Sequence, residues 1–192
     1  MNTFEVSSYN QLRIAPTDIP GLKVIALALH SDERGWFKEN YQKEKMVALG
    51  FPADFIPVQN NISYNAHRGV TRGVHAEPWD KYVSIATGSA FAAVVDLRKG
   101  PTYGKVLTFA LNPGIALFIP KGCGNSFQAL EDGTIYSYLV NAHWSADIKY
   151  PAVDLADPQL AIQWPIPLEL AEVSPKDKEN PPFKDIQPIE IS

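Results

Sequence analysis

Two short segments of the chain carry side chains that can transfer protons or bind metals. His75, Glu77 and Lys81 lie close together in the first segment, and Asn125 closely follows two glycines in the second. A neutral imidazole accepts a proton near neutral pH, and a buried ammonium can stabilise a developing oxyanion. An imidazole also binds metals, but an ammonium repels a divalent cation and a side-chain amide is a poor ligand for a borderline-soft ion. The combination therefore favours proton transfer over metal chemistry.

The first segment resembles the first motif of the cupin β-barrels, which is a Gly, five residues, His-x-His, a Glu and a later Gly. It reads Gly69-Val-Thr-Arg-Gly-Val-His75-Ala-Glu77-Pro-Trp-Asp-Lys81 and is followed by Gly88. Both glycines and the first His of the motif are kept. Glu77 stands in place of the second His, and Lys81 stands in place of the Glu.

The second segment resembles the second cupin motif and reads Gly114-Ile-Ala-Leu-Phe-Ile-Pro120-Lys-Gly122-Cys-Gly-Asn125. Asn125 replaces the His of that motif, so three of the four ligands found in metal-binding cupins are altered. The resemblance implies an all-β fold, a cupin-type double-stranded β-helix (jelly-roll) barrel with short peripheral helices. It also implies that the metal site is lost, and we expect neither a metal nor a cofactor.

The overall composition limits the classes of function. A chain of 192 residues with a net charge of −4 fits a single globular domain and argues against a general nucleic-acid surface. The single Cys123 excludes an intramolecular disulfide, and we expect it to be a small buried residue. The N-terminus does not resemble a signal peptide, and no apolar run approaches the ~18 residues needed to span a membrane. We therefore expect a cytoplasmic protein with no nucleic-acid or membrane partner.

Short runs rich in β-branched and aromatic residues, mostly bounded by Gly, Pro, Asn or Asp, predict the strands. These runs are Leu22–Leu29, Tyr82–Ala86, Ala90–Leu97, Val106–Leu111, Ile115–Ile119 and Ile135–Val140. Alternation within the last run puts Tyr136 and Tyr138 on one face of the strand. The pattern is typical of an antiparallel sandwich or barrel.

Helical patterns are few. Residues Lys43–Leu49 predict a helix that ends at Gly50, and a weaker pattern predicts a second helix at Pro158–Ile162. The stretch Pro175–Pro182 is typical of a surface turn or linker. We expect residues 1–192 to form one domain, with 178–192 as an extended tail or a linker to a further domain.

Further segments resemble one cupin family, the dTDP-4-dehydrorhamnose 3,5-epimerases. They follow the order of the family from about residue 20 to residue 177. The matching segments are Asp32–Glu39, Val58–Ser63, Thr71–His75, Asp96–Gly104, Ile119–Gly122, Asp157–Pro165 and Ser174–Asp177. Each is weak evidence alone, but together they indicate the family strongly.

The resemblance implies a role for each of four residues. His75 falls at the general base of the family, Asp177 at the carboxylate that orients this base, and Tyr138 at the general acid. Lys81 falls at the lysine near the 4-keto oxygen of the substrate. A proton next to a ketone is weakly acidic, so its removal needs both a base and stabilisation of the enolate.

The resemblance also implies a binding site for the nucleotide. Arg34 and Arg72 match residues that contact the diphosphate, which suits the planar fork of Arg. Asn61 and Asn125 are predicted to contact the substrate as well. The residues expected to hold the nucleotide base are Phe37, Glu39, Gln59 and Trp144.

Each assignment has a structural alternative. An isolated His, Tyr or Trp on or beside a strand is often a packing residue. Asp177 could belong to a solvated turn, and Arg34 could pair with Asp32 or Glu33 at the surface. Three departures from the family pattern, Glu77, Ala92 and Asn125, leave open whether one carbon or two are inverted.

The function implied is cofactor-independent epimerisation at carbon 3, carbon 5 or both of a dTDP-4-keto-6-deoxyhexose, in the synthesis of dTDP-rhamnose or a related deoxysugar for cell-wall polysaccharide. The alternatives are a dTDP-sugar 3,4-ketoisomerase and a non-catalytic sugar-nucleotide-binding cupin. A metal-dependent oxygenase is disfavoured by Lys81 and Asn125. The expected partners are a dTDP-sugar substrate, a second copy of the chain and a dTDP-4-dehydrorhamnose reductase. The two copies would form a homodimer in which Arg34 of one chain reaches the site of the other.

Overall fold

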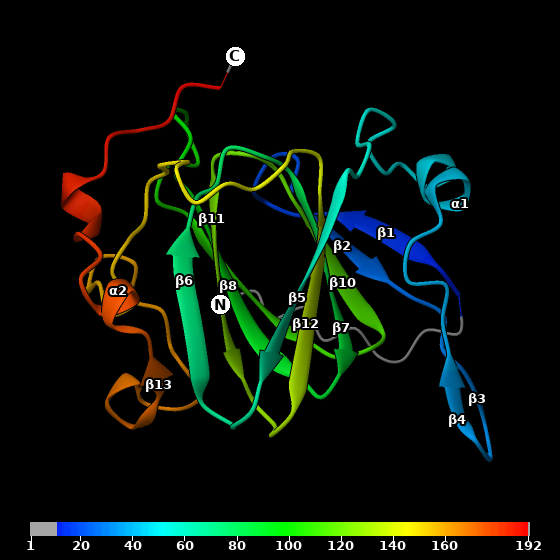
Figure 1. The fold of residues 1–192 in the computed structure, drawn as a ribbon. Helices are drawn as coiled ribbons and strands as arrows, with labels where there is room; N and C mark the ends of the chain where they lie inside the picture. The colour runs from blue at the N-terminus through cyan, green and yellow to red at the C-terminus, as the bar shows by residue number, and fades with distance from the viewer. Residues whose placement is uncertain (1–10, 192) are drawn as a thin grey trace.

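Two largely antiparallel β-sheets face one another in the computed structural model, which describes residues 11–191 (Figure 1). The first sheet contains, in spatial order, β1 (Arg13–Pro16), β2 (Lys23–Ala26), β10 (Ile115–Ile119), β7 (Lys81–Thr87), β12 (Thr134–Val140) and β5 (Gln59–Asn65). The second contains β13 (Glu172–Val173), β6 (Val70–His75), β11 (Cys123–Ala129), β8 (Ala90–Asp96) and β9 (Val106–Leu111). Most neighbouring strands in the two sheets are distant in sequence, and the prediction of an all-β cupin-type barrel is confirmed.

The predicted strands correspond to observed ones. The runs Val106–Leu111 and Ile115–Ile119 match β9 and β10 at both ends. The runs that correspond to β7, β8 and β12 differ from the observed strands by at most one residue at either end. The first run, Leu22–Leu29, is longer than β2, and residues 27–29 lie outside the strand. The polar strands β5, β6 and β11 lack a strong β-type composition, so they had not been predicted as strands.

Apolar side chains from both sheets fill the space between them. Val83 of β7, Val94 of β8, Leu117 of β10 and Phe127 of β11 belong to this central core. Burial of side chains of this size stabilises the fold by about 1.5–3 kcal/mol each. The same cluster contains Cys123, which is buried as expected.

The helix α1 (Lys43–Ala48) covers the outer face of the first sheet, as Figure 1 shows. Its first turn is capped by the Gln42 side chain, which accepts a hydrogen bond from the Lys45 amide at 2.7 Å. It ends before Gly50, whose φ of +91° suits the residue after a helix C-cap. Met46 is buried against an aromatic cluster beneath the helix, so the predicted helix is confirmed and its packing explains its stability.

The segment after β12 covers the outer face of the second sheet. Leu155, Leu160 and Ile186 pack there against Val74 and Leu97. The Ile189 amide donates a hydrogen bond to the Leu97 carbonyl at 2.8 Å, so the chain beyond residue 178 lies along the barrel. This segment includes the short 3₁₀ turns η1 (Leu168–Leu170) and η2 (Phe183–Asp185).

The second predicted helix, Pro158–Ile162, is wrong. The Asp157 carboxylate accepts hydrogen bonds from the amides of Gln159 and Leu160, which closes a turn instead of a helix. Ala161 then has a φ of +47°, a conformation that cannot continue a right-handed helix. Local side-chain hydrogen bonding therefore prevailed over the helical pattern.

The interpretation of Pro175–Pro182 as a surface turn or linker is also wrong. Residues Pro175–Lys178 form the helix α2, with Ser174 as its N-cap and a proline in its first turn. Asp177, in the middle of this helix, is buried. The helix contacts β6, which carries His75.

A hairpin of β3 (His30–Asp32) and β4 (Gly35–Phe37) projects from the barrel near β1 and α1 (Figure 1). Trp36 and Phe37 are exposed on it. Its base is fixed by Lys38, whose ammonium donates hydrogen bonds to the carbonyls of Ile85 and Pro113 at 2.7 and 2.9 Å. Among residues 11–191, no helix is long and apolar enough to cross a membrane.

One polar network anchors the end of β8 to the loop that follows it. The Asp96 carboxylate accepts hydrogen bonds from the Arg98 guanidinium at 2.8 Å and from the Thr102 hydroxyl at 2.7 Å. Arg98 also donates to the Pro20 carbonyl at 2.8 Å. Burial raises the pKa of Asp96, but these hydrogen bonds outweigh it and hold the pKa below its usual value.

We expect Asp96→Asn to destabilise the protein by roughly 1.5–3 kcal/mol at neutral pH, the range for hydrogen bonds to charged groups. The pKa of Asp96 is lowered in the folded state. Its contribution to the free energy of unfolding is therefore present above its unfolded pKa of about 3.9 and is lost as the pH falls below that value. Urea unfolding between pH 7 and pH 3 should therefore show the wild-type and variant curves converging at low pH. Glu190→Gln, which breaks the exposed Lys99–Glu190 pair, is the control and should change stability little. A constant difference across the pH range would contradict the assignment.

Candidate active site

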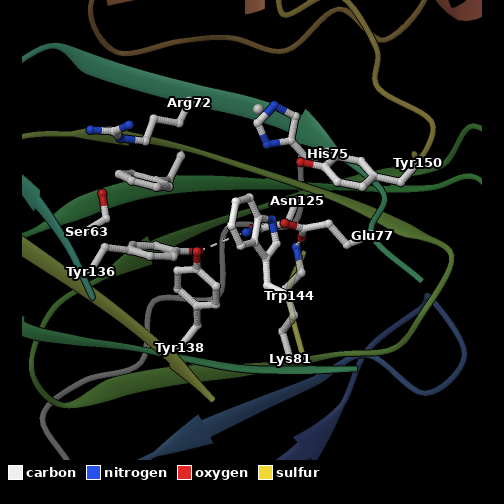
Figure 2. A pocket seen from close by; sticks show the side chains of 12 residues that line it. Ser63, Arg72, His75, Glu77, Lys81, Asn125, Tyr136, Tyr138, Trp144 and Tyr150 are labelled. Atoms are coloured by element: carbon white, nitrogen blue, oxygen red, sulfur yellow. Dashed lines mark hydrogen bonds and ion pairs between the residues drawn. The ribbon is translucent and has the colours of Figure 1, made fainter. Parts of the chain in front are cut away.

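Side chains from both sheets line a cavity of about 290 Å³ at one end of the barrel (Figure 2). Because side chains alternate along a strand, β11 and β12 each contribute residues of one face, whereas the register of β6 shifts against β11 and lets both Arg72 and His75 line the cavity. The lining residues are Ser63, Arg72, Gly73, His75, Glu77, Lys81, Asn125, Phe127, Tyr136, Tyr138, Trp144 and Tyr150. Six of the residues predicted from the sequence are among them: Arg72, His75, Lys81, Asn125, Tyr138 and Trp144.

His75 forms a pair with Asp177, which lies behind it on α2. The distance from His75 Nε2 to Asp177 Oδ1 is 2.7 Å. Although burial raises the pKa of Asp177, hydrogen bonds from His75, Gly73 and Ser174 lower it below the usual value. An ionised carboxylate can only accept a hydrogen bond, so Nε2 carries the proton and Nδ1 keeps a free lone pair. The arrangement orients an imidazole that can accept a proton through Nδ1.

Gly73 allows the strand that carries His75 to lie close to β11. A Cβ atom at this position would lie 2.5 Å from Ser126 Cβ and 2.6 Å from the Asn125 carbonyl oxygen, and its φ is +117°. The Gly73 amide also donates to Asp177 Oδ2 at 3.2 Å. Glycine is therefore needed here for both the close approach of the strands and the unusual backbone conformation.

Glu77 and Lys81 form an ion pair in the wall of the cavity. The side chains are only 10% and 5% exposed, respectively. Burial lowers the pKa of the Lys81 ammonium, while the adjacent carboxylate favours its charged form. The cavity wall therefore contains a buried lysine paired with a buried carboxylate.

Two tyrosines of β12 enter the cavity, and they share one face of the strand, as the alternation along Ile135–Val140 predicted. Tyr136 is buried, stacks on Phe127 with ring centroids 3.9 Å apart, and donates a hydrogen bond to Asn125 Oδ1 at 3.3 Å. Tyr138 is partly buried, and burial raises its pKa, so its hydroxyl keeps its proton at neutral pH. Tyr138 is thus available as a proton donor, whereas Tyr136 positions Asn125.

A set of hydrogen-bonded polar residues lies beside two of the lining residues, Trp144 and Arg72. The Gln59 amide donates a hydrogen bond to Asn61 Oδ1 at 2.7 Å and accepts one from the Trp144 amide at 3.0 Å. The Arg72 guanidinium donates to Asn65 Oδ1 at 3.1 Å. The sequence predicted Gln59, Asn61, Arg72 and Trp144 as binding residues, and the fold brings Gln59, Asn61 and Trp144 into one hydrogen-bonded group.

Arg34, Phe37 and Glu39, also predicted as binding residues, lie away from this cavity within one chain. Arg34 and Phe37 are on the β3–β4 hairpin and border a separate depression there. Arg34 pairs with Asp32, which was the structural alternative for this residue. Glu39 pairs with Lys45 of α1 at 2.6 Å.

Sequence reasoning missed Ser63, Phe127 and Tyr150 as lining residues. Ser63 could have been found from its position two residues after Asn61 on the same face of β5. Tyr150 has no comparable signal, since it lies in the irregular segment after β12. Its ring meets the His75 ring edge-on, with the centroids 5.9 Å apart (Figure 2). It also lies under the ammonium of Lys176, so it connects the His75 side of the cavity to α2.

Of the three departures from the family pattern, two line the cavity. Glu77 and Asn125 face the enclosed space, whereas Ala92 of β8 is buried in the central core. In residues 11–191, no three His, Cys, Asp or Glu side chains gather in a group that could hold a metal ion.

Known proteins similar to this chain in sequence have related descriptions. Residues 16–185 match the family described as dTDP-4-dehydrorhamnose 3,5-epimerase. The chain is 46% identical over 178 residues to a protein named RmlC homolog of Streptococcus pyogenes serotype M6, covering 90% of this chain and 89% of the relative. It is 34% identical over 176 residues to a dTDP-4-dehydrorhamnose 3-epimerase of Streptomyces niveus, covering 88% of this chain and 82% of the relative.

A solved structure has a similar fold. It is that of RmlC from Streptococcus suis in complex with dTDP-D-xylose, with a TM-score of 0.90 and 45% sequence identity. The similarity covers 94% of this chain and 95% of that chain.

Proposed function

The chain belongs to the dTDP-4-dehydrorhamnose 3,5-epimerase family, and on this premise we propose that its cavity inverts carbons next to the ketone of a dTDP-4-keto-6-deoxyhexose. The observation that carries the proposal is the oriented His75–Asp177 pair, in one cavity with Tyr138 and Lys81. The reaction is an isomerisation that belongs to the synthesis of dTDP-rhamnose. The enzyme is therefore an isomerase.

The mechanism needs a base and an acid at the same carbon. Nδ1 of His75 removes the proton beside the ketone, and the electron pair moves onto the ketone oxygen to form an enolate. Asp177 stabilises the imidazolium that results, because its carboxylate faces Nε2. Tyr138 then gives its hydroxyl proton to the carbon from the opposite face, which inverts the centre. Solvent returns the proton to Tyr138 and takes the one held by His75.

Lys81 supplies the electrostatic part of the mechanism. Its ammonium is buried, where a charge interacts more strongly than it does in water. An enolate oxygen placed beside it gains a hydrogen bond from a group already fixed in the cavity wall. No redox step is needed, since the substrate and the product are isomers.

Proton NMR of dTDP-4-keto-6-deoxyglucose with the pure protein in deuterated buffer tests the proposal. Deuterium entering at carbons 3 and 5 would establish a double epimerase, and entry at one carbon would establish a single one. The resemblance to a 3-epimerase makes the second result a specific candidate, with Asn125 and Glu77 as the residues to examine. Complete retention of the substrate hydrogens would reject epimerisation of this substrate.

Replacing Tyr138 with phenylalanine should slow inversion more than it slows deuterium exchange. Proton removal by His75 precedes reprotonation, so the intermediate can still form and return its proton on the original face. A positioned acid typically contributes about 10²–10⁴-fold, which sets the expected loss of inverted product. Product formation and exchange measured in one NMR time course give both rates. Equal losses would argue against Tyr138 as the acid.

We also propose a homodimer in which the β3–β4 hairpin of one chain completes the cavity of the other. Arg34 and Phe37 are on an exposed projecting hairpin that lies away from the cavity of their own chain, while Arg72 is at that cavity. Exposed Ile62 and Tyr64 on the edge strand β5 add apolar surface for such a contact. A diphosphate would then meet Arg72 of one chain and Arg34 of the other.

Mixing two inactive variants tests this arrangement. Subunits of Arg34→Ala and His75→Ala, unfolded together and refolded, should recover activity in hybrid dimers, because one cavity then receives both the wild-type histidine and a wild-type hairpin. Each variant refolded alone is the control and should stay at its own low rate. No recovery would place Arg34 in the cavity of its own chain or outside the site.

The remaining interpretations rest on the sequence. A dTDP-sugar 3,4-ketoisomerase would also use a histidine base, but an acid at Tyr138 on the inverting face favours the epimerase. A non-catalytic sugar-nucleotide-binding protein would bind thymidine diphosphate and exchange no hydrogen.

We propose a cytoplasmic location, a single domain over residues 1–192, a role in cell-wall polysaccharide synthesis and a dTDP-4-dehydrorhamnose reductase acting on the product.

A further inference from the structure

The Glu77–Lys81 pair is set in a rigid part of the cavity wall. Asp80, between the two residues, accepts a hydrogen bond from the Lys121 amide at 2.8 Å. The Asn141 side chain also bonds Asp80 twice, accepting from its amide at 3.0 Å and donating to its carboxylate at 2.8 Å. The short loop from His75 to Lys81 is thereby held to the start of β11 and the end of β12. Figure 2 shows Glu77 and Lys81 extending toward the same region of the cavity.

Glu77 is the one acidic side chain among the residues that line the cavity in the described part of the chain. The titratable groups that face the cavity from other elements are His75 and Arg72 of β6, Tyr136 and Tyr138 of β12, and Tyr150 of the following segment. β11 contributes the neutral Asn125, and Asp177 is directed at His75 from behind. Glu77 is therefore the acidic partner that Lys81 meets.

A lone ammonium in such a site would not keep its charge. Burial disfavours the protonated form of lysine, and it lowers the pKa of Lys81. An adjacent carboxylate opposes this effect, because an opposite charge favours the protonated form of lysine. The ammonium can at the same time donate to a ligand in the cavity, since it carries three N–H bonds.

This inference rests on the proposed function: we propose that Glu77 is a positioning residue that acts through Lys81, by keeping its ammonium protonated beside the place where the enolate oxygen forms. Lys81 donates a hydrogen bond to that oxygen throughout the reaction and keeps its proton. The proton taken from carbon resides on His75, and the enolate electron pair returns to carbon when Tyr138 protonates it. Glu77 gains and loses no proton in the cycle.

Glu77→Gln tests the proposal because it removes the charge and keeps the size of the side chain. We expect the alkaline limb of the pH profile of deuterium exchange to move to lower pH by about one to three units, the usual effect of a close opposite charge. Below that limb, exchange should stay within about threefold of wild type, since Lys81 is then charged in both proteins. Glu131→Gln, a change of an exposed residue distant from the cavity, should leave the profile in place.

A second variant and a second background make the test decisive. Glu77→Asp keeps the charge but shortens the reach, so its alkaline limb should lie between those of wild type and Glu77→Gln. In the Lys81→Met background, Glu77→Gln should no longer move the limb. A loss of rate that is uniform across pH, or an unmoved limb in both Glu77 variants, would overturn the role of Glu77. Absence of exchange in the wild-type protein would instead reject the proposed function.

Discussion

Replacing His75 with alanine is expected to reduce deuterium exchange at the carbons beside the ketone by about 10²–10⁴-fold, the contribution of a positioned base. The variant removes the only imidazole among the residues that line the cavity in the described chain. Binding of thymidine diphosphate should change little, because the residues predicted to contact the nucleotide lie elsewhere. Exchange followed by NMR and binding followed by calorimetry separate the two effects.

Two further variants show whether the loss comes from the imidazole itself. His67→Ala, at an exposed turn between β5 and β6, is the matched control and should retain the wild-type rate. Asp177→Asn keeps the size of the side chain but no longer favours the His75 tautomer with its proton on Nε2. The rate of deuterium exchange in this variant should therefore fall between the rates of wild type and His75→Ala. Wild-type exchange in His75→Ala would remove His75 as the base.

Replacing Lys81 with methionine is expected to reduce both exchange and inversion by about 10²–10³-fold, the usual loss when one preorganised donor to an oxyanion is removed. Both rates should fall together, because both pass through the enolate. This pattern differs from that of Tyr138→Phe, in which exchange should outlast inversion. Normal exchange in Lys81→Met would reject its role at the enolate oxygen.

The same variant should lose stability for a separate reason. Without the ammonium, the Glu77 carboxylate is buried and unpaired, which typically costs about 3–5 kcal/mol. Adding Glu77→Gln should restore much of that stability without restoring activity. Lys99→Met, which breaks an exposed pair with Glu190, should cost at most about 1 kcal/mol. Urea unfolding of the four proteins measures these differences.

Local sequence was sufficient for the apolar barrel strands and for one helix. β8, β9 and β10 are short apolar runs between turn residues, and their conformation follows from composition and burial alone. Gly50 marks the end of α1 because a residue with positive φ is needed there. The strands β5, β6 and β11 have more polar faces, since they line the cavity, so their composition gave a weaker signal.

The helix predicted at Pro158–Ile162 and the turn predicted at Pro175–Pro182 failed for related reasons. At the first, the Asp157 carboxylate bonds nearby amides and also the Phe183 amide at 2.7 Å, a contact that its neighbours in sequence do not reveal. At the second, Asp177 is buried because His75 and Gly73 lie against it. In both cases a distant part of the chain decided the local structure.

By itself, the sequence determined the fold class and the family, because its motifs resemble those of the cupins and of one cupin family, and the same resemblance predicts which residues transfer protons. The resemblance also predicted that Asp177 orients His75, but only the tertiary structure decided how these two meet and which other residues surround them. Asp177 reaches His75 across 102 residues of chain, and Tyr150 approaches the same imidazole from an irregular segment. Likewise, Glu77 became the partner of Lys81 because both were buried in one wall. Such contacts depend on strand pairing and on the desolvation of charges, and neither is encoded in the spacing of residues along the chain.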